Sequence, residues 1–309
     1  MPTLKLSEIA AHDPDLILPP DEEFAEDYRL MVESGQALAS FGKVAFVAIC
    51  RNAMPFLPLT LKRIEETAKM FADWRCFIYE NDSTDGTKEF LSTLGEPYMV
   101  VSKDNGRPHL NFSKSSDRTV ALAEYRNECR LWVKENCPDF YYTIVFDTDP
   151  WGGFSVDGVA NSIGQLSMIE DAVGMGSFSF CKWGPPVWPQ PMWCQYDGWA
   201  ARLNHYSDRP NTWFHLWHPP IGSPPVKMNS CFGQLAVYKT PHYLHGVYAG
   251  GDCEHVSHWK TCGGDCYLNP SSRVVSFWVL DEDDNDRLHS DVHSNVDGRS
   301  ADEDHRGNS

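Results

Sequence analysis

The sequence has no apolar run long enough to cross a membrane, and its N-terminus lacks the basic-then-apolar pattern of a secretory signal. Basic residues are scarce: 26 lysines and arginines stand against 43 acidic residues, for a formal net charge of −17. Residues 281–309 contribute −7 of that charge, so residues 1–280 still carry −10. These features favour a cytoplasmic protein and disfavour nucleic-acid binding through phosphate neutralisation.

The ten cysteines also lack a pattern, because no Cys-x2-Cys pair of the zinc-ribbon type is present. Without a secretory signal, we interpret them as reduced thiols, several of them inside apolar segments. A structural zinc site remains an alternative near the C-terminus. Its candidate ligands are Cys253, His255, His258, Cys262 and Cys266.

What the sequence does contain is an alternation of short apolar runs and amphipathic stretches, which predicts an α/β fold with a doubly wound, mostly parallel sheet. We expect a helical extension over residues 1–42 and one domain over 43–280, divided into a nucleotide-binding half (43–150) and an acceptor half (151–280). The Trp/Pro-rich stretch 183–225 is predicted to be a long loop, and the acidic stretch 281–309 a disordered tail.

One strand stands out, because Phe140 to Phe146 is a run of aromatic and β-branched residues that ends in Asp147-Thr148-Asp149. Residues i and i+2 of an extended chain point to the same side, so both carboxylates can face one divalent metal ion with an attached diphosphate. The alternative is a buried strand followed by an ordinary polar turn.

A second acidic cluster, Glu80 to Thr87, follows the apolar run Cys76–Tyr79 and precedes a predicted helix. Ser, Thr and Asp residues there are explained by helix capping alone. Glu80 and Asp82 are explained less well, and carboxylates at this position can accept hydrogen bonds from a base or a ribose.

The third cluster, Asp252 to His258, reads as a loop that opens a helix. Helical spacing places Asp252 and His255 on one face, and Glu254 and His258 on another. A carboxylate here could serve as a general base, and a histidine could complete a metal site begun by Asp149. A capped helix with Asp252 as its cap is the alternative.

These motifs together resemble a GT-A-fold glycosyltransferase: Arg51-Asn52 after an apolar strand, the Glu80–Thr87 turn, Arg126-Asn127 on a helix, and Asp147-Thr148-Asp149. The fungal capsule-associated α-1,3-mannosyltransferase type is more similar still, with Cys253-Glu254-His255 and Asn269-Pro270 in the matching order. The resemblance covers residues 43–280 and departs at 183–225.

The resemblance implies a Rossmann-type, GT-A-like sheet, Mn²⁺ or Mg²⁺ as cofactor, and a GDP- or UDP-linked sugar as donor. Glu254 and Asp252 would be catalytic, and Asp147, Asp149, His255 and His258 would hold the metal. The nucleotide sugar would contact Arg51, Glu80, Asp82, Asp85, Arg118, Arg126 and Asp147. Apart from the resemblance, aromatic side chains often receive sugar rings, so the acceptor is predicted to rest on Trp151, Trp183, Trp188 and Trp193.

The function that follows is a metal-dependent hexosyltransferase that moves a sugar to a hydroxyl of a glycan or similar acceptor. Two alternatives remain open. One is a non-catalytic carbohydrate-binding protein, although such a protein need not keep both Asp147 and Asp149. The other is a nucleotide-sugar hydrolase.

Overall fold

The computed structural model describes residues 13–109, 114–183, 192–203, 214 and 216–277. Strands of this part of the chain form one ten-stranded sheet in the order β3-β2-β1-β4-β9-β6-β10-β5, with β7 paired to β6 and β8 to β10. The strands are β1 (Lys43–Cys50), β2 (Asp73–Asn81), β3 (Tyr98–Lys103), β4 (Tyr142–Asp147), β5 (Gly153–Phe154), β6 (Ala172–Trp183), β7 (Met192–Gln195), β8 (Val226–Met228), β9 (Leu235–Lys239) and β10 (Asp265–Phe277).

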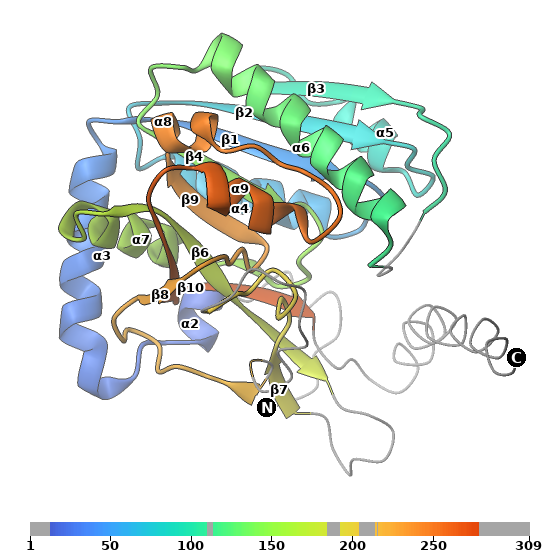
Figure 1. Ribbon diagram of the computed structural model, residues 1–309. Coiled ribbons are helices and arrows are strands. Elements are labelled where there is room, and N and C mark those ends of the chain that lie inside the picture. The colour runs from blue at the N-terminus through green and yellow to red at the C-terminus, as the bar shows by residue number, and fades with distance from the viewer. Residues whose placement is uncertain (1–12, 110–113, 184–191, 204–213, 215, 278–309) are drawn as a thin grey trace, which may run out of the picture.

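Helices cover the sheet on both faces (Figure 1). The helices described are α2 (Pro14–Ile17), η1 (Glu22–Phe24), α3 (Ala25–Ala39), α4 (Leu57–Ala68), α5 (Thr87–Leu91), α6 (Ser116–Asn136), α7 (Val156–Met168), α8 (Thr240–His245) and α9 (Glu254–Thr261). One apolar core lies on the α6, α8 and α9 side. A second core lies on the α4 and α7 side, where α3 packs outside α7.

The predicted parallel sheet is confirmed in its first half, where β3, β2, β1 and β4 all run parallel. In β1, Val44 to Ala48 are buried without a break, as a continuous apolar run predicts for a strand covered on both faces. The second half is mixed, because β9 runs antiparallel to β4 and β6 while β6 and β10 are parallel. The carboxyl ends of β1, β2 and β4 therefore meet at one edge of the sheet.

The N-terminal helical segment is built into this body. A Cβ atom on Gly35 would overlap the Ala160 carbonyl, so α3 and α7 touch through their backbones. Upstream, the Asp15 carboxylate accepts hydrogen bonds from Val156 N and Asp157 N, at 3.1 and 3.2 Å, and pairs with Arg273 Nη2 at 2.5 Å. Ser155 is the N-cap of α7, and the segment adds a carboxylate for two further amides of its first turn and the counter-charge of a fully buried arginine.

The sequence prediction missed the strands β5, β7 and β8 and the six-residue helix α8. β7 lies within the stretch predicted to be a loop, and it is a strand because it pairs with the end of β6. Across the described ranges, no helix combines the length and the apolar character needed to span a membrane. The predicted tail 281–309 lies outside the described residues.

Gly35→Ala tests the backbone contact between α3 and α7. Alanine favours a helix by about 1 kcal/mol over glycine, but overpacking against a backbone carbonyl costs about 1–3 kcal/mol. We expect a net loss of unfolding free energy, measured by urea denaturation. Gly95→Ala is the control, because a Cβ there meets nothing within 4 Å. Equal stability of the two variants would contradict the close approach.

Candidate active site

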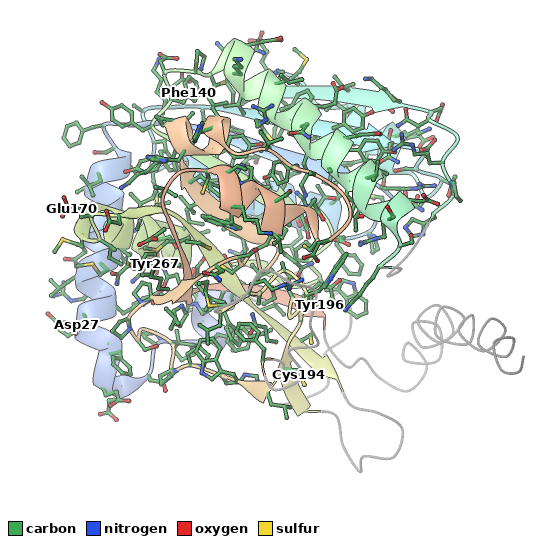
Figure 2. All side chains as sticks on the ribbon, viewed as in Figure 1. Asp27, Phe140, Glu170, Cys194, Tyr196 and Tyr267 are labelled. Carbon is green, nitrogen blue, oxygen red and sulfur yellow. The ribbon has the colours of Figure 1, made fainter. Side chains whose placement is uncertain are left out.

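A cleft of about 1060 Å³ opens at the edge of the sheet where β1, β2 and β4 end. Its walls come from the turns after these strands, the first half of α6, the loop after β7, the turn before β9 and the start of α9. A smaller hollow of about 660 Å³ is lined by residues at the other end of β4. Figure 2 shows Phe140 of this hollow and Tyr196 of the cleft on opposite sides of the view. Several of the predicted site residues line the larger cleft, among them Arg126, Asp147, Asp149 and Glu254.

Asp147 and Asp149 both line this cleft, as the sequence predicted from their spacing. Asp147 is the last residue of β4, and its backbone N–H donates to the Gln234 carbonyl at 2.8 Å. Burial within the cleft, aided by the carboxylates of Asp149 and Asp197 and opposed by Arg126, raises the pKa of Asp147 to about 7. The pKa of Asp149 is raised by the same desolvation, although its side chain is exposed to the cavity.

Asp197, in the loop after β7, is a cleft carboxylate that the sequence analysis missed. Its two oxygens accept hydrogen bonds from Gly233 N at 2.9 Å and Ala200 N at 3.3 Å. Desolvation outweighs these bonds and raises its pKa to about 6. Three acidic side chains with raised pKa values thus share one cavity, which favours a positively charged ligand among them.

Arg126 lies behind these acids as a buried ion pair with two partners. Its Nη2 is 3.1 Å from Asp147 Oδ1, and its Nε is 2.9 Å from Glu254 Oε1. The arginine is 5% exposed, and its guanidinium stands 4.9 Å from the centre of the Phe232 ring. Two of the three guanidinium nitrogens are thus occupied by these carboxylates. Only Nη1, which has no hydrogen-bond partner, remains for the predicted contact with a diphosphate.

Basic side chains gather at a different part of the cleft. Lys114, just before α6, and Arg118, in its first turn, lie 5.4 and 6.0 Å from the centre of the Trp199 ring. Arg51 lines the same cleft and donates to the Arg107 carbonyl at 3.0 Å. Arg118 and Arg51, two predicted nucleotide contacts, therefore line the cleft, and Lys114 and Trp199 line it as well.

The acids of the turn after β2 are engaged elsewhere. Glu80 is fully buried and accepts hydrogen bonds from Ser83 N at 2.8 Å and from the Ser102 hydroxyl. Asp82 accepts from Gly106 N at 2.8 Å, and Asp85 accepts from Met54 N at 3.0 Å. None of the three lines the cleft, so their predicted nucleotide contacts are not supported. From this turn, the cleft receives Asn81 instead.

The predicted catalytic pair Asp252 and Glu254 is divided by the structure. Glu254 lines the cleft, 3% exposed, at the start of α9. Asp252 lies outside the lining and pairs with the buried Arg202 at 3.0 Å. The structure therefore does not support the predicted catalytic role of Asp252, because its carboxylate neutralises an internal charge.

The predicted metal set of Asp147, Asp149, His255 and His258 does not assemble. Within the described ranges, no three His, Cys, Asp or Glu side chains lie together in a way that could hold a metal ion. His258 is fully buried against Tyr248, donates from Nε2 to the Tyr243 carbonyl at 3.1 Å, and has its pKa lowered to about 3 by burial. It is a core histidine, whereas His255 lines the cleft.

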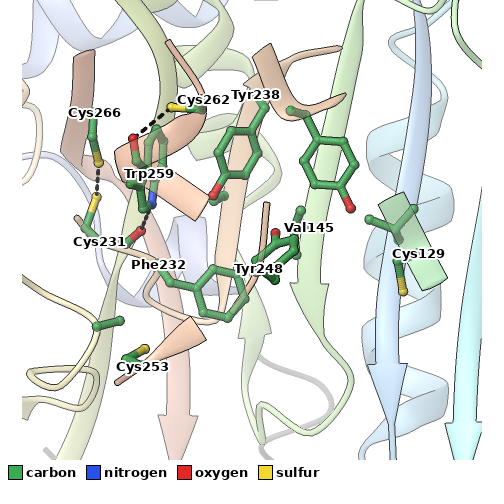
Figure 3. Close-up of a cluster of buried hydrophobic side chains, with 14 of the residues drawn as sticks. Cys129, Val145, Cys231, Phe232, Tyr238, Tyr248, Cys253, Trp259, Cys262 and Cys266 are labelled. Atoms are coloured by element: carbon green, nitrogen blue, oxygen red, sulfur yellow. Dashed lines mark hydrogen bonds between the residues drawn. The ribbon is translucent and has the colours of Figure 1, made fainter. Parts of the chain in front are cut away.

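The alternative zinc site fails for the same reason. Cys266 meets Cys231 at a sulfur–sulfur distance of 3.3 Å, and Cys262 donates to the Trp259 carbonyl at 3.2 Å (Figure 3). All ten cysteines are buried thiols without a disulfide, in agreement with the prediction of reduced cysteines.

Of the predicted acceptor tryptophans, Trp151 stacks on Phe56 at 5.1 Å and is not among the residues that line the cleft. Trp188, and the side chains of Trp183 and Trp193, lie outside the described residues. Trp199, which was not among the predicted acceptor residues, lines the cleft. The sequence carried one signal for this loop, an acid followed by glycine and tryptophan at Asp197-Gly198-Trp199.

Comparison with solved structures supports the fold. A structure of GalNAc-T7 with UDP, GalNAc and Mn²⁺ matches with a TM-score of 0.51 and 14% identity, over 87% of this chain and 55% of that one. The present chain thus spans about half the length of that protein. The chain has a GT-A-like fold.

Two further similar structures have TM-scores below 0.5. A mannosyltransferase from Pyrobaculum calidifontis in complex with GDP-Man and Mn²⁺ gives 0.42 at 13% identity, over 88% of this chain and 68% of that one. S. aureus TarS 1–349 in complex with UDP-GlcNAc gives 0.43 at 9% identity, over 85% and 69%. No protein-family model matches the GT-A-like chain, and no curated protein matches its sequence.

Asp147→Asn tests the raised pKa in protein stripped of metal with EDTA. A carboxyl whose folded pKa is raised stabilises the fold fully below its ordinary pKa, and this contribution is lost as pH rises through about 7. Asparagine cannot ionise and keeps an oxygen for Arg126. The wild type should therefore lose stability relative to the variant between about pH 4 and pH 7, by up to about 1.4 kcal/mol per pH unit. Urea unfolding measures this difference, and parallel curves would contradict it.

Proposed function

We propose that the protein is a divalent-metal-dependent glycosyltransferase, which moves a hexose from a nucleotide-sugar donor to a hydroxyl of a glycan or similar acceptor. The observation that carries the proposal is the placement of Asp147 and Asp149 at the carboxyl end of β4, in a large cleft with basic side chains on its wall. In open α/β sheets, ligands bind at this edge. The GT-A-like fold and the resemblance to capsule-associated mannosyltransferases agree with it.

The two aspartates suit Mn²⁺ or Mg²⁺ as they stand. Such ions prefer oxygen ligands and are commonly held by one or two carboxylates together with substrate phosphates, so a complete protein cage is not needed. The raised pKa values of Asp147 and Asp149 indicate carboxylates that lack a sufficient cation. A metal ion bound there would offset the negative charge of the departing nucleoside diphosphate.

The donor's diphosphate would lie between these aspartates and the basic part of the wall. Arg118 is the strongest partner for it, because the guanidinium matches phosphate oxygens and lies close enough to Asp149 to lower its pKa in part. Lys114 adds a second positive charge beside the same Trp199 ring. Arg51, Asn52 and Asn81 line the end of the cleft formed by β1 and β2, where the nucleoside would bind.

In the proposed reaction, the acceptor hydroxyl must lose its proton. Asp197 suits this task, because it lies half-buried in the cleft and its pKa, raised to about 6, is near the operating pH. Glu254 is less available, since it is 3% exposed and Oε1 is held by Arg126. We therefore assign Glu254 to orienting Arg126 and Asp147, and Asp197 to accepting the proton.

Thermal shift with UDP or GDP, in the presence and absence of Mn²⁺, tests the proposal. We expect the wild type to gain stability from nucleoside diphosphate and metal together, because ligand binding to the folded state raises Tm. Asp149→Asn should abolish this gain while keeping the unliganded Tm. Asp27→Asn, an exposed substitution on α3, is the control and should behave as the wild type.

Absence of any metal-linked stabilisation by nucleoside diphosphates would refute the enzyme and favour a non-catalytic carbohydrate-binding protein. A stabilised protein that releases free sugar from the donor, at a rate that acceptors do not raise, would be a hydrolase instead.

Asp197→Asn tests the proposed base. It should lower kcat by about 10²–10⁴ while nucleoside diphosphate binding persists, because asparagine still offers an oxygen to the backbone but cannot take a proton. Release of nucleoside diphosphate from the best donor gives the rate. Asp252→Asn is the matched control: it should lower stability, because Arg202 loses its ionic partner, and leave kcat of the folded protein unchanged. Wild-type kcat in Asp197→Asn would remove that residue from the mechanism.

A further inference from the structure

The inner wall of the cleft contains polar atoms that are buried without a hydrogen-bond partner. They are both ring nitrogens of His255, Oε1 of Gln234 and Nη1 of Arg126. Glu254 Oε1 lies 3.5 Å from His255 Nε2 and is not hydrogen-bonded to it. The three residues are 2%, 4% and 5% exposed. Each unpaired buried polar group costs about 1–3 kcal/mol, so their gathering at one place calls for a reason. A ligand that hydrogen-bonds to them is such a reason.

Phe232 brings these residues to one place. Its ring is stacked on the His255 imidazole, with centroids 3.8 Å apart, and the Arg126 guanidinium lies 4.9 Å from the same ring. Gln234 follows in the same turn, with a φ of +63°, and its carbonyl accepts the Asp147 N–H at 2.8 Å. Figure 3 shows Phe232 in the same buried cluster as Tyr248 and Cys253, the residue that precedes α9. Arg126 and the backbone of Gln234 thus contact Asp147, and His255 and Arg126 both contact the Phe232 ring.

The chemistry of these atoms fits hydroxyl groups. Burial, reinforced by the charge of Arg126, keeps the pKa of His255 well below its ordinary value, so the imidazole is neutral. One ring nitrogen then donates and the other accepts. Gln234 Oε1 accepts and Arg126 Nη1 donates. Donors and acceptors side by side, without a free positive charge on His255, match a polyhydroxylated ring better than a phosphate, for which Lys114 and Arg118 offer charge elsewhere in the cleft.

We propose that His255 and Gln234 determine which sugar the protein accepts, by hydrogen-bonding to hydroxyl groups on the hexose of the donor. This inference rests on the proposed function. The atoms concerned have almost no exposed surface, so the sugar reaches them when neighbouring side chains of the cleft shift, which makes recognition an induced fit. His255 is thereby assigned to the sugar rather than to the metal.

Isothermal titration with Mn²⁺ separates the two levels of the proposal. The ligands are UDP, GDP, UDP-glucose, UDP-galactose, UDP-GlcNAc and GDP-mannose. His255→Phe keeps the stack on Phe232, and Gln234→Met keeps the length of the side chain. Both should bind UDP or GDP as the wild type does, within about twofold. Both should lose at least tenfold in affinity for the preferred nucleotide sugar, together with the preference between epimers. A tenfold loss corresponds to about 1.4 kcal/mol.

Two companions exclude a merely structural effect. His255→Gln restores a donor and an acceptor, and should recover part of the lost sugar affinity. His245→Phe, an exposed histidine outside the cleft lining, should change neither affinity. In the wild type, removal of one hydroxyl from the sugar of the preferred donor should weaken binding at least tenfold for at least one position. In His255→Phe or Gln234→Met, that penalty should disappear.

Unchanged sugar affinity and epimer preference in both variants, with UDP or GDP binding intact, would overturn the inference and leave the proposed function standing. If either variant fails to fold, the wild type decides through the deoxygenated donors: equal binding of all of them overturns the inference. Failure of both UDP and GDP to bind with Mn²⁺ would refute the proposed function and the inference with it.

Discussion

The ion pairs of Arg126 are the interaction on which the site depends. One guanidinium joins the end of β4, through Asp147, to the start of α9, through Glu254, while α6 carries it between them. A buried ion pair of this kind contributes little net stability compared with an apolar equivalent, but removing one partner costs about 3–5 kcal/mol. Its role is therefore to fix the relative positions of three elements. Asp147, Glu254 and His255 inherit their places from that arrangement.

Charge is divided along the cleft as a consequence. The acids Asp147, Asp149 and Asp197 lie in a region of low solvation, which raises the pKa of all three. The charges of Asp149 and Asp197 raise the pKa of Asp147 further. The cations Lys114 and Arg118 stand at the start of α6 and are not ion-paired with these acids in the described structure. This separation of charge matches a metal-bound diphosphate, whose cation would lie beside the acids and whose negative oxygens would lie beside the basic side chains.

The sequence predicted what depends on local pattern. The strand Lys43–Cys50 and the carboxylate pair Asp147 and Asp149 followed from an unbroken apolar run and from the two-residue period of an extended chain. Prediction from the sequence failed where the hydrogen-bond partners of a side chain lie far from it along the chain. Asp197 acquires its place from Gly233, 36 residues away, and Glu80 spends its carboxylate on Ser83 and Ser102 rather than on a ligand. Helical spacing could not reveal that Tyr248 and Tyr243 cover His258.

The contact of Gly35 with Ala160 makes the N-terminal segment part of the packed structure. A chain that started at β1 would retain every strand of the parallel half, and it would still lose the carboxylate of Asp15. Arg273 would then lose its counter-ion together with the Leu18 carbonyl and the Tyr28 hydroxyl, and the Val156 and Asp157 amides would lose their acceptor. The structural unit therefore extends upstream of the first strand, and a boundary drawn at residue 42 would divide it.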